Sequence, residues 1–335
     1  MKTPDSMPPP NQTFAEIAAV LCDARRIGVV SHLRPDGDAL GSLLGFALSL
    51  EAAGKDVICL NQDGVPWHLA FLPGAGKVMK PDGGVLDVDV AVVLDTATQD
   101  RVGEGCLHAL SAAKIVVNID HHPSNPRYGQ LNYVDGKAPA VGEIVFDFLK
   151  SQNLPVTDAV RDNLFVAIST DTGSFQYSST TAHTHEVVAE MMKSGLDTAR
   201  LSNLLYSQNP MRRVELLRTL LNEMQFRANH RIASWIYTQA TKERIGVLPG
   251  DTEGLIDNLR SIDTVIAAVI FEETRDGSIR VSARSKDERV DVSAVCAQFG
   301  GGGHRLAAGA TLPPPIETAS ALYLQALEEH VERTA

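Results

Sequence analysis

Short aliphatic runs alternate with helical segments over the first 195 residues of the chain. Apolar runs without polar alternation predict parallel strands that are covered on both faces, and apolar residues recurring every three or four positions predict helices. The predicted strands are 27–30, 56–60, 88–94 and 114–119, and the predicted helices are 14–26, 39–53, 157–170 and 182–195. This alternation predicts an α/β domain with a doubly wound, mostly parallel sheet.

A different order of elements follows residues 196–210, where the strand-helix alternation is lost. The predicted helices are 211–225, 292–299 and 316–333, the predicted strands are 232–237, 264–271, 279–283 and 308–312, and residues 300–304 are a predicted loop. Asp276-Gly277 predicts a hairpin turn between two of these strands. We therefore expect a domain at 14–195, a linker at 196–215 and a smaller α/β domain with a mixed sheet at 216–335.

The first predicted strand leads directly into a turn that contains His32, Asp36 and Asp38. Open α/β sheets bind ligands at such strand-to-helix turns. His32 and Asp36 can chelate one cation across the turn, whereas Asp38 starts the next helix and faces another direction. One turn could therefore serve two metal ions. Taken alone, these residues would also suit a structural turn in which Asp38 caps the helix.

Metal-binding side chains also follow two further predicted strands and one predicted helix. These residues are Asp95, Asp120, His121, His122 and Asp171. Many carboxylates with few imidazoles suit Mn²⁺ or Mg²⁺ better than structural zinc. Two such ions about 3.5–4 Å apart can activate a water and stabilise the entering and leaving oxygens of a phosphoryl displacement. Clustering at successive element ends favours a phosphoester-hydrolysing site over separate structural roles.

Arg284 and the glycine run 300–303 are the candidate ligand contacts of the C-terminal domain. Consecutive glycines often form a flexible linker, but here they join a short helix to an apolar strand, which favours close backbone approach to a ligand. Arg284 alternates with core-facing positions on its strand and could bind a phosphate through two hydrogen bonds. His304 could stack on a base or donate to a phosphate.

The net charge and the cysteine spacing limit which binding partners and which cellular compartment we expect. The formal net charge of -11 argues against wrapping a long nucleic acid, which needs many basic contacts, but it permits a short anionic substrate. The four cysteines are widely spaced and predict neither a zinc site nor a disulfide framework. Residues 1–12 predict a disordered lead-in without a signal peptide. We expect a cytoplasmic protein without membrane partners.

Six short motifs together resemble those of one protein family. They are Leu33-Arg34-Pro35-Asp36-Gly37-Asp38-Ala39, Leu94-Asp95-Thr96, Asp120-His121-His122, Thr170-Asp171-Thr172-Gly173-Ser174-Phe175, Arg284-Ser285-Lys286 and Gly301-Gly302-Gly303-His304. The first four resemble the DHH phosphoesterase superfamily, and the last two resemble its DHH-associated C-terminal domain. The resemblance covers about residues 14–330 and implies an active site in the cleft between two domains.

The resemblance also implies a role for each candidate residue. One metal ion would be held by His32, Asp36 and Asp95, and a second by Asp38, Asp95, His121 and Asp171. Asp95 would bridge the ions, His122 would act on the substrate phosphate, and Asp120 would orient its neighbours. The implied substrate-binding residues are Arg284, Ser285, Lys286, Gly302, Gly303 and His304. Two divalent cations are expected, with Mn²⁺ favoured and Mg²⁺ or Co²⁺ as alternatives.

The compact layout is most similar to the oligoribonuclease and phosphoadenosine-phosphate phosphatase branch, also called nano-RNases. We therefore expect hydrolysis of short oligoribonucleotides, above all dinucleotides, and of phosphoadenosine phosphate (pAp) to mononucleotides. Alternatives are a phosphodiesterase for cyclic di-AMP or its linear product pApA, and a single-strand exonuclease. A nucleotide sensor without turnover is disfavoured, because binding alone needs no bridging carboxylate. A homodimer is a further expectation.

Overall fold

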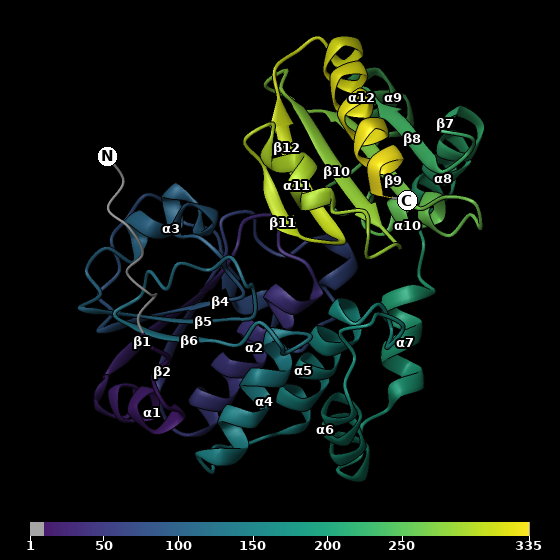
Figure 1. Cartoon of the computed structure of the whole chain (residues 1–335). Coiled ribbons are helices and arrows are strands. Elements are labelled where there is room, and N and C mark those ends of the chain that lie inside the picture. The colour runs from purple at the N-terminus through teal and green to yellow at the C-terminus, as the bar shows by residue number, and fades with distance from the viewer. Residues whose placement is uncertain (1–9, 335) are drawn as a thin grey trace. The chain divides into compact units, whose positions relative to one another are not determined.

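A computed structural model describes residues 10–334, which form two compact units that divide between Gln208 and Asn209. Residues 1–9, most of the expected lead-in, lie outside the described residues. Each unit is built around its own six-stranded sheet (Figure 1). The residues expected to form a linker include helix α7 (Thr198–Tyr206) and the start of α8 (Met211–Glu223). Asp197 caps α7 by accepting a hydrogen bond from Arg200 N.

The first unit contains a parallel sheet in the order β3-β2-β1-β4-β5-β6. Its strands are β1 (Arg26–Ser31), β2 (Asp56–Leu60), β3 (Val78–Met79), β4 (Val90–Leu94), β5 (Ile115–Asp120) and β6 (Leu131–Val134). The four predicted strands correspond to β1, β2, β4 and β5, which confirms the predicted parallel sheet. The unpredicted strands β3 and β6 are short and lie at the two edges.

Helices cover both faces of this sheet, because neighbouring residues of a buried strand point to opposite sides. Val29 packs into the larger core, with α2, α4 and α5, whereas Val30 packs into the smaller core, with α3. The helices are α1 (Phe14–Asp23), α2 (Gly37–Ala52), α3 (Glu104–Ala109), α4 (Val141–Ser151), α5 (Asp158–Asp171) and α6 (Ala182–Lys193), with 3₁₀ turns η1 (Trp67–Leu69), η2 (Ala75–Lys77) and η3 (Gln99–Val102).

Glycines on α2 allow this helix to approach α5 closely. A Cβ atom on Gly41 would lie 2.5 Å from the carbonyl oxygen of Asn163 and 2.9 Å from Cβ of Ala167. The contact matters for function because α2 begins at the His32–Asp38 turn and α5 ends at Asp171. Close packing of these two helices therefore fixes the candidate ligands on both.

Gly41→Ala is expected to lower the free energy of unfolding by about 1–3 kcal/mol, the usual cost of overpacking a core. Chemical unfolding of the variant and the parent protein measures this difference. Gly76→Ala is the matched control, because a Cβ there meets no atom within 4 Å. Equal stability of the Gly41 variant and the parent would contradict the close α2–α5 contact.

The second unit has the mixed sheet that was predicted, and its strands follow the order β11-β12-β10-β9-β8-β7. Its strands are β7 (Gln225–Arg227), β8 (Ile232–Tyr237), β9 (Ala267–Glu273), β10 (Ile279–Ser285), β11 (Gly302–His304) and β12 (Ala307–Leu312). Its remaining helices are α9 (Gln239–Ile245), α10 (Leu255–Arg260), α11 (Val292–Ala297) and α12 (Ile316–Thr334). Only β8 and β9 pair in parallel within residues 209–334. In the described part of the chain, the helices lack the combination of length and apolarity that crossing a membrane requires.

The glycine run differs from the loop that we predicted. Gly302 and Gly303 form part of the edge strand β11, which pairs with β12. A Cβ atom on Gly301 would collide with the carbonyl oxygen of Gly309, and one on Gly303 would lie 2.6 Å from the carbonyl oxygen of Ala307. Gly301 and Gly303 are therefore required by the neighbouring strand, whereas a Cβ on Gly302 would face open space.

Candidate metal centre

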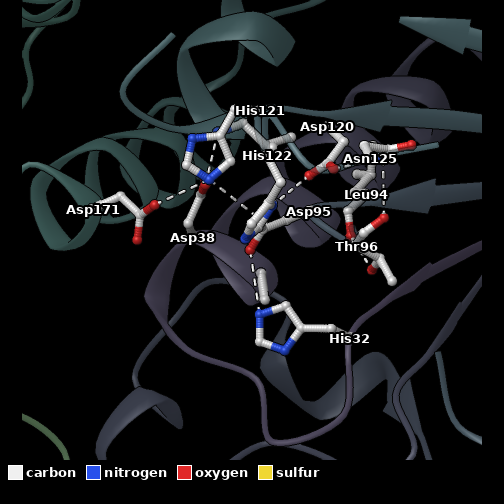
Figure 2. A network of polar contacts seen from close by, with 12 residues as sticks. His32, Asp38, Leu94, Asp95, Thr96, Asp120, His121, His122, Asn125 and Asp171 are labelled. Atoms are coloured by element: carbon white, nitrogen blue, oxygen red, sulfur yellow. Dashed lines mark hydrogen bonds and ion pairs between the residues drawn. The ribbon is translucent and has the colours of Figure 1, made fainter. Parts of the chain in front are cut away.

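Six candidate ligands of the first unit lie together near the carboxyl ends of adjacent strands, and Figure 2 labels all of them except Asp36. His32 follows β1, Asp95 follows β4, and His121 follows β5. Parallel strands end at the same edge of a sheet, so these side chains converge. We call the following set the metal centre: His32, Asp36, Asp38, Asp95, His121 and Asp171.

One group of ligands consists of His32, Asp36 and Asp95, whose donor atoms lie within 4.8 Å of one another. His32 Nε2 is 3.3 Å from Asp95 Oδ2 and 3.7 Å from Asp36 Oδ2. His32 Nδ1 lies 2.8 Å from the carbonyl oxygen of Leu33. A proton on Nδ1 would satisfy that carbonyl, so Nε2, which faces two carboxylates, could bind a cation in exchange for its own proton. This arrangement could hold a divalent cation.

The second group contains Asp38, Asp95 and His121, also within 4.8 Å, and Asp171 adjoins it. His121 Nε2 is 3.5 Å from Asp95 Oδ1 and 3.3 Å from Asp171 Oδ2. His121 Nδ1 lies 3.2 Å from the carbonyl oxygen of Ala138, so this ring can also present an unprotonated Nε2 to carboxylates. The two groups share Asp95, which lies between them in Figure 2.

The helix after the first strand is capped by Asp36 and not by Asp38. Asp36 caps α2 by accepting a hydrogen bond from Ala39 N at 3.0 Å. Asp38 lies in the first turn of α2 and accepts hydrogen bonds from Val141 N at 2.7 Å and Gly142 N at 2.9 Å, which begin α4. The alternative that Asp38 caps its own helix is therefore wrong, and Asp38 is held in place by a second helix.

Three features of Asp95 favour ligand binding by its carboxylate. It is 2% exposed, and its φ of 50° is uncommon for a residue other than glycine. Its backbone N donates to the carbonyl oxygen of Ile119 at 3.1 Å, which fixes the carboxylate between the two groups. Asp95 Oδ1 is buried without a hydrogen-bond donor among the described residues. A bound cation would satisfy this oxygen.

The electrostatics of the centre also fit cations. Burial raises the pKa of Asp38 to about 8, and the charge of Asp95 adds to this rise. Burial and the charge of Asp38 raise the pKa of Asp171 well above its ordinary value. Burial opposes protonation of His32, but its contacts with Asp36 and Asp95 raise the pKa to about 10. Crowded carboxylates in a low dielectric are stabilised by divalent cations, so these residues fit a metal pair.

His122 and Asp120 lie beside the centre and are supported by side chains that the sequence analysis missed. His122 Nδ1 is 2.8 Å from Asp120 Oδ1. Asn125 Nδ2 donates to Asp120 Oδ2 at 2.6 Å and to Asn118 Oδ1 at 2.7 Å. Asp120 is fully buried, so this network fixes its carboxylate and thereby the His122 ring. The only sequence signal for Asn125 is its place in the turn that follows the histidine pair.

Asn61 is another supporting residue that the sequence analysis missed. Its Nδ2 donates to the carbonyl oxygen of His32 at 2.9 Å, and its Oδ1 accepts from the backbone N of Asp63 at 3.0 Å. Asn61 is fully buried and follows β2, so it ties the ends of two adjacent strands together. The polar residue directly after an apolar strand was its sequence signal.

In the second unit, Arg284 and His304 flank the same residue of β12. Both lie opposite Ala307, on β10 and β11 respectively. Residues opposite one another in adjacent strands point to the same face, so Arg284 and His304 share a face with only a small side chain between them. Arg284 is half-buried and has no carboxylate partner within the second unit's described residues. This face could bind an anionic ligand.

Ser285 and Lys286 both donate hydrogen bonds to backbone carbonyls, with Ser285 buried and Lys286 exposed. Ser285 is 1% exposed, and its hydroxyl donates to the carbonyl oxygen of Ile266 at 3.0 Å. Lys286 Nζ donates to the carbonyl oxygens of Ile262 at 2.5 Å and Asp263 at 3.0 Å. These contacts hold the end of β10 against the segment that precedes β9.

Comparisons with known proteins identify two matching domains and a curated relative. Residues 26–168 match the DHH family, N-terminal domain, and residues 233–332 match the DHHA1 domain. A Thermus thermophilus relative named bifunctional oligoribonuclease and PAP phosphatase NrnA is 30% identical over 308 residues, 92% of this chain and 90% of that protein.

Solved structures share the fold at lower sequence identity. A crystal structure of an exopolyphosphatase-related protein from Bacteroides fragilis has a TM-score of 0.86 at 24% identity, covering 95% of this chain and 96% of that one. A structure of RecJ in complex with Mn²⁺ from Thermus thermophilus has a TM-score of 0.53 at 14% identity, covering 96% of this chain and 54% of that one. The two matched domains and the Thermus relative show that this chain belongs to the DHH phosphoesterase family.

Proposed function

We propose that this protein is a metal-dependent hydrolase that converts short oligoribonucleotides, above all dinucleotides, and pAp to mononucleotides. The observation that carries the proposal is the pair of buried ligand groups that share Asp95. Such a pair suits phosphoester hydrolysis, because the entering and leaving oxygens both need charge stabilisation. The name of the Thermus relative supports the substrate class, since it describes an oligoribonuclease and PAP phosphatase.

His32, Asp36 and Asp95 would hold one cation, and Asp38, Asp95, His121 and Asp171 the other. Mn²⁺ is the favoured ion, with Mg²⁺ and Co²⁺ as alternatives. When bound, such a pair supplies an acidified water and Lewis-acid stabilisation of a phosphate. Asp120 would hold the His122 ring so that His122 can donate a hydrogen bond or a proton to the phosphate.

The protein's charge supports a preference for short substrates. A long strand gains affinity mainly through additional basic contacts, and this chain has a net charge of -11. Arg284 would bind a part of the substrate remote from the cleaved bond. His304, across Ala307 from Arg284, would contribute to this contact together with Gly302 and Gly303, which lie on the same strand as His304. Ser285 and Lys286 would contribute by holding the end of β10.

A substrate panel tests the proposed function. The purified protein is incubated with Mn²⁺ and dinucleotides, longer oligoribonucleotides, pAp, pApA, cyclic di-AMP or pyrophosphate, and the products are separated by chromatography. We expect mononucleotides from dinucleotides and pAp. A preference for long single strands would favour an exonuclease, preferred cleavage of cyclic di-AMP or pApA would favour that phosphodiesterase, and binding without turnover would favour a sensor.

Arg284→Ala is expected to weaken dinucleotide binding by about 1.5–3 kcal/mol, because it removes a charged hydrogen-bond partner. Hydrolysis of bis-p-nitrophenyl phosphate should stay nearly unchanged, since this small substrate needs only the metal centre. Steady-state kinetics on both substrates measure the difference. Arg280→Ala is the matched control on β10, because Arg280 is already paired with Glu272. Equal losses on both substrates would show that Arg284 has a structural role.

We also propose a cytoplasmic location for this protein. All four cysteines are free thiols, which supports a reducing, cytoplasmic environment. We propose no membrane partner, and the homodimer stays a prediction that light scattering of the purified protein can test.

A further inference from the structure

Arg101 lies beside the metal centre and outside the six sequence motifs. It belongs to η3, which follows β4, and its carbonyl oxygen accepts a hydrogen bond from Leu33 N at 2.7 Å. This bond ties η3 to the turn that carries His32 and Asp36. The Arg101 side chain reaches the same turn, with Nη2 3.4 Å from His32 Nδ1.

The guanidinium of Arg101 forms no ion pair with a carboxylate among residues 10–334. Its contact with His32 Nδ1 is weak, because Nδ1 lies only 2.8 Å from the carbonyl oxygen of Leu33 and needs its proton for that bond. The chain has 41 acidic and 30 basic residues, so a half-buried arginine without a carboxylate partner, beside so many carboxylates, is unexpected. Its donors are therefore available to an anion.

We propose that Arg101 binds the phosphate group that is hydrolysed, an inference that rests on the proposed function. A guanidinium presents a planar fork of N–H donors that matches two oxygens of one phosphate. The backbone bond to Leu33 fixes the origin of the side chain, so the fork is held next to one ligand group. In this position Arg101 adds positive charge where the phosphate gains negative charge during hydrolysis.

Arg101 and Arg284 should therefore differ in their substrate dependence. Every substrate contains the phosphate that is hydrolysed, so loss of Arg101 should impair dinucleotides and bis-p-nitrophenyl phosphate alike. Loss of Arg284 should impair only substrates that extend beyond that phosphate. This contrast separates a contact at the reacting group from a contact with the remote part of the substrate.

Arg101→Met and Arg101→Lys test the inference. For each variant we would measure Mn²⁺ binding, binding of AMP to the Mn²⁺-loaded protein by calorimetry, and kinetics on both substrates. In Arg101→Met we expect kcat/KM to fall by about 100-fold on both substrates, as when one preorganised donor is lost. AMP binding should weaken by at least about tenfold, whereas Mn²⁺ binding should be unchanged. Arg101→Lys should recover part of both losses, because it keeps the charge.

Arg25→Met is the matched control, because it also removes one positive charge. Arg25 lies just before the amino end of β1, and its exposed side chain pairs with Asp87. We expect this control to match the parent protein in every measurement.

Two results would overturn the inference. One is AMP binding and turnover by Arg101→Met at parent levels. The other is a loss of Mn²⁺ binding as large as the loss of turnover, which would mean that Arg101 supports the metal ligands. AMP binding to the parent and to Arg101→Lys decides the matter if the Met variant fails to fold. The same comparison decides it if the parent hydrolyses no substrate of the panel, a result that would overturn the proposed function alone.

Discussion

Asp95→Ala is expected to reduce Mn²⁺-dependent turnover by at least about 100-fold. Asp95 Oδ2 lies 3.3 Å from His32 Nε2, and Asp95 Oδ1 lies 3.5 Å from His121 Nε2, so one side chain contributes to both ligand groups. Its removal would take a ligand from each proposed metal ion and leave the remaining candidate ligands with less charge to hold either. Turnover of dinucleotide and a Mn²⁺ titration of the same sample measure both effects.

Asp95→Asn tests the loss of the carboxylate charge separately from any change in the backbone turn. Asn tolerates the positive φ at this position better than Ala, so the turn should keep its shape while the carboxylate is lost. We expect this variant to unfold at nearly the parent denaturant concentration and still to lose most of its activity. Asp87→Ala, which removes an exposed carboxylate that pairs with Arg25, is the control. Near-parent turnover by Asp95→Asn at saturating Mn²⁺ would rule out a shared Asp95.

The position of the metal centre was predictable because it follows from strand ends. Buried runs such as 90–94 have no polar alternation, so their limits are visible in the sequence within one or two residues. His32, Asp95 and His121 come directly after such runs, and the parallel arrangement then brings them together. The order of the strands was not needed for this step, since any adjacent parallel strands would place their ends at one edge.

The surroundings of these ligands depend on contacts between distant residues and were not predictable. Asp38 is oriented by the first residues of α4, a helix that lay outside the predicted elements, so its hydrogen bonds had no sequence signal. Gly301 and Gly303 suggested a nearby ligand, but the backbone that approaches them belongs to β12, with which β11 pairs. Arg101 was missed for the same reason, because only the folded chain brings it to His32.

His121→Ala and His122→Ala are expected to slow turnover by about 100-fold each, through different steps. His121 Nε2 faces Asp171 Oδ2 at 3.3 Å and Asp95 Oδ1 at 3.5 Å, so its loss should weaken Mn²⁺ binding together with the rate. His122 Nδ1 is engaged by Asp120 at 2.8 Å, so its loss should leave Mn²⁺ binding intact and lower kcat. Mn²⁺ titration and steady-state kinetics on the same preparations separate the two roles.

Asp120→Asn extends this comparison to the support of His122. It removes the charge that faces His122 Nδ1 but keeps the size of the side chain, so it should lower kcat by less than His122→Ala and leave Mn²⁺ binding unchanged. His108→Ala is the histidine control, because His108 is exposed on α3. If His122→Ala lost Mn²⁺ binding while His121→Ala kept it, the two roles would have to be exchanged. His122 would then be the metal ligand next to Asp95, whose Oδ1 lies 3.7 Å from His122 Nδ1.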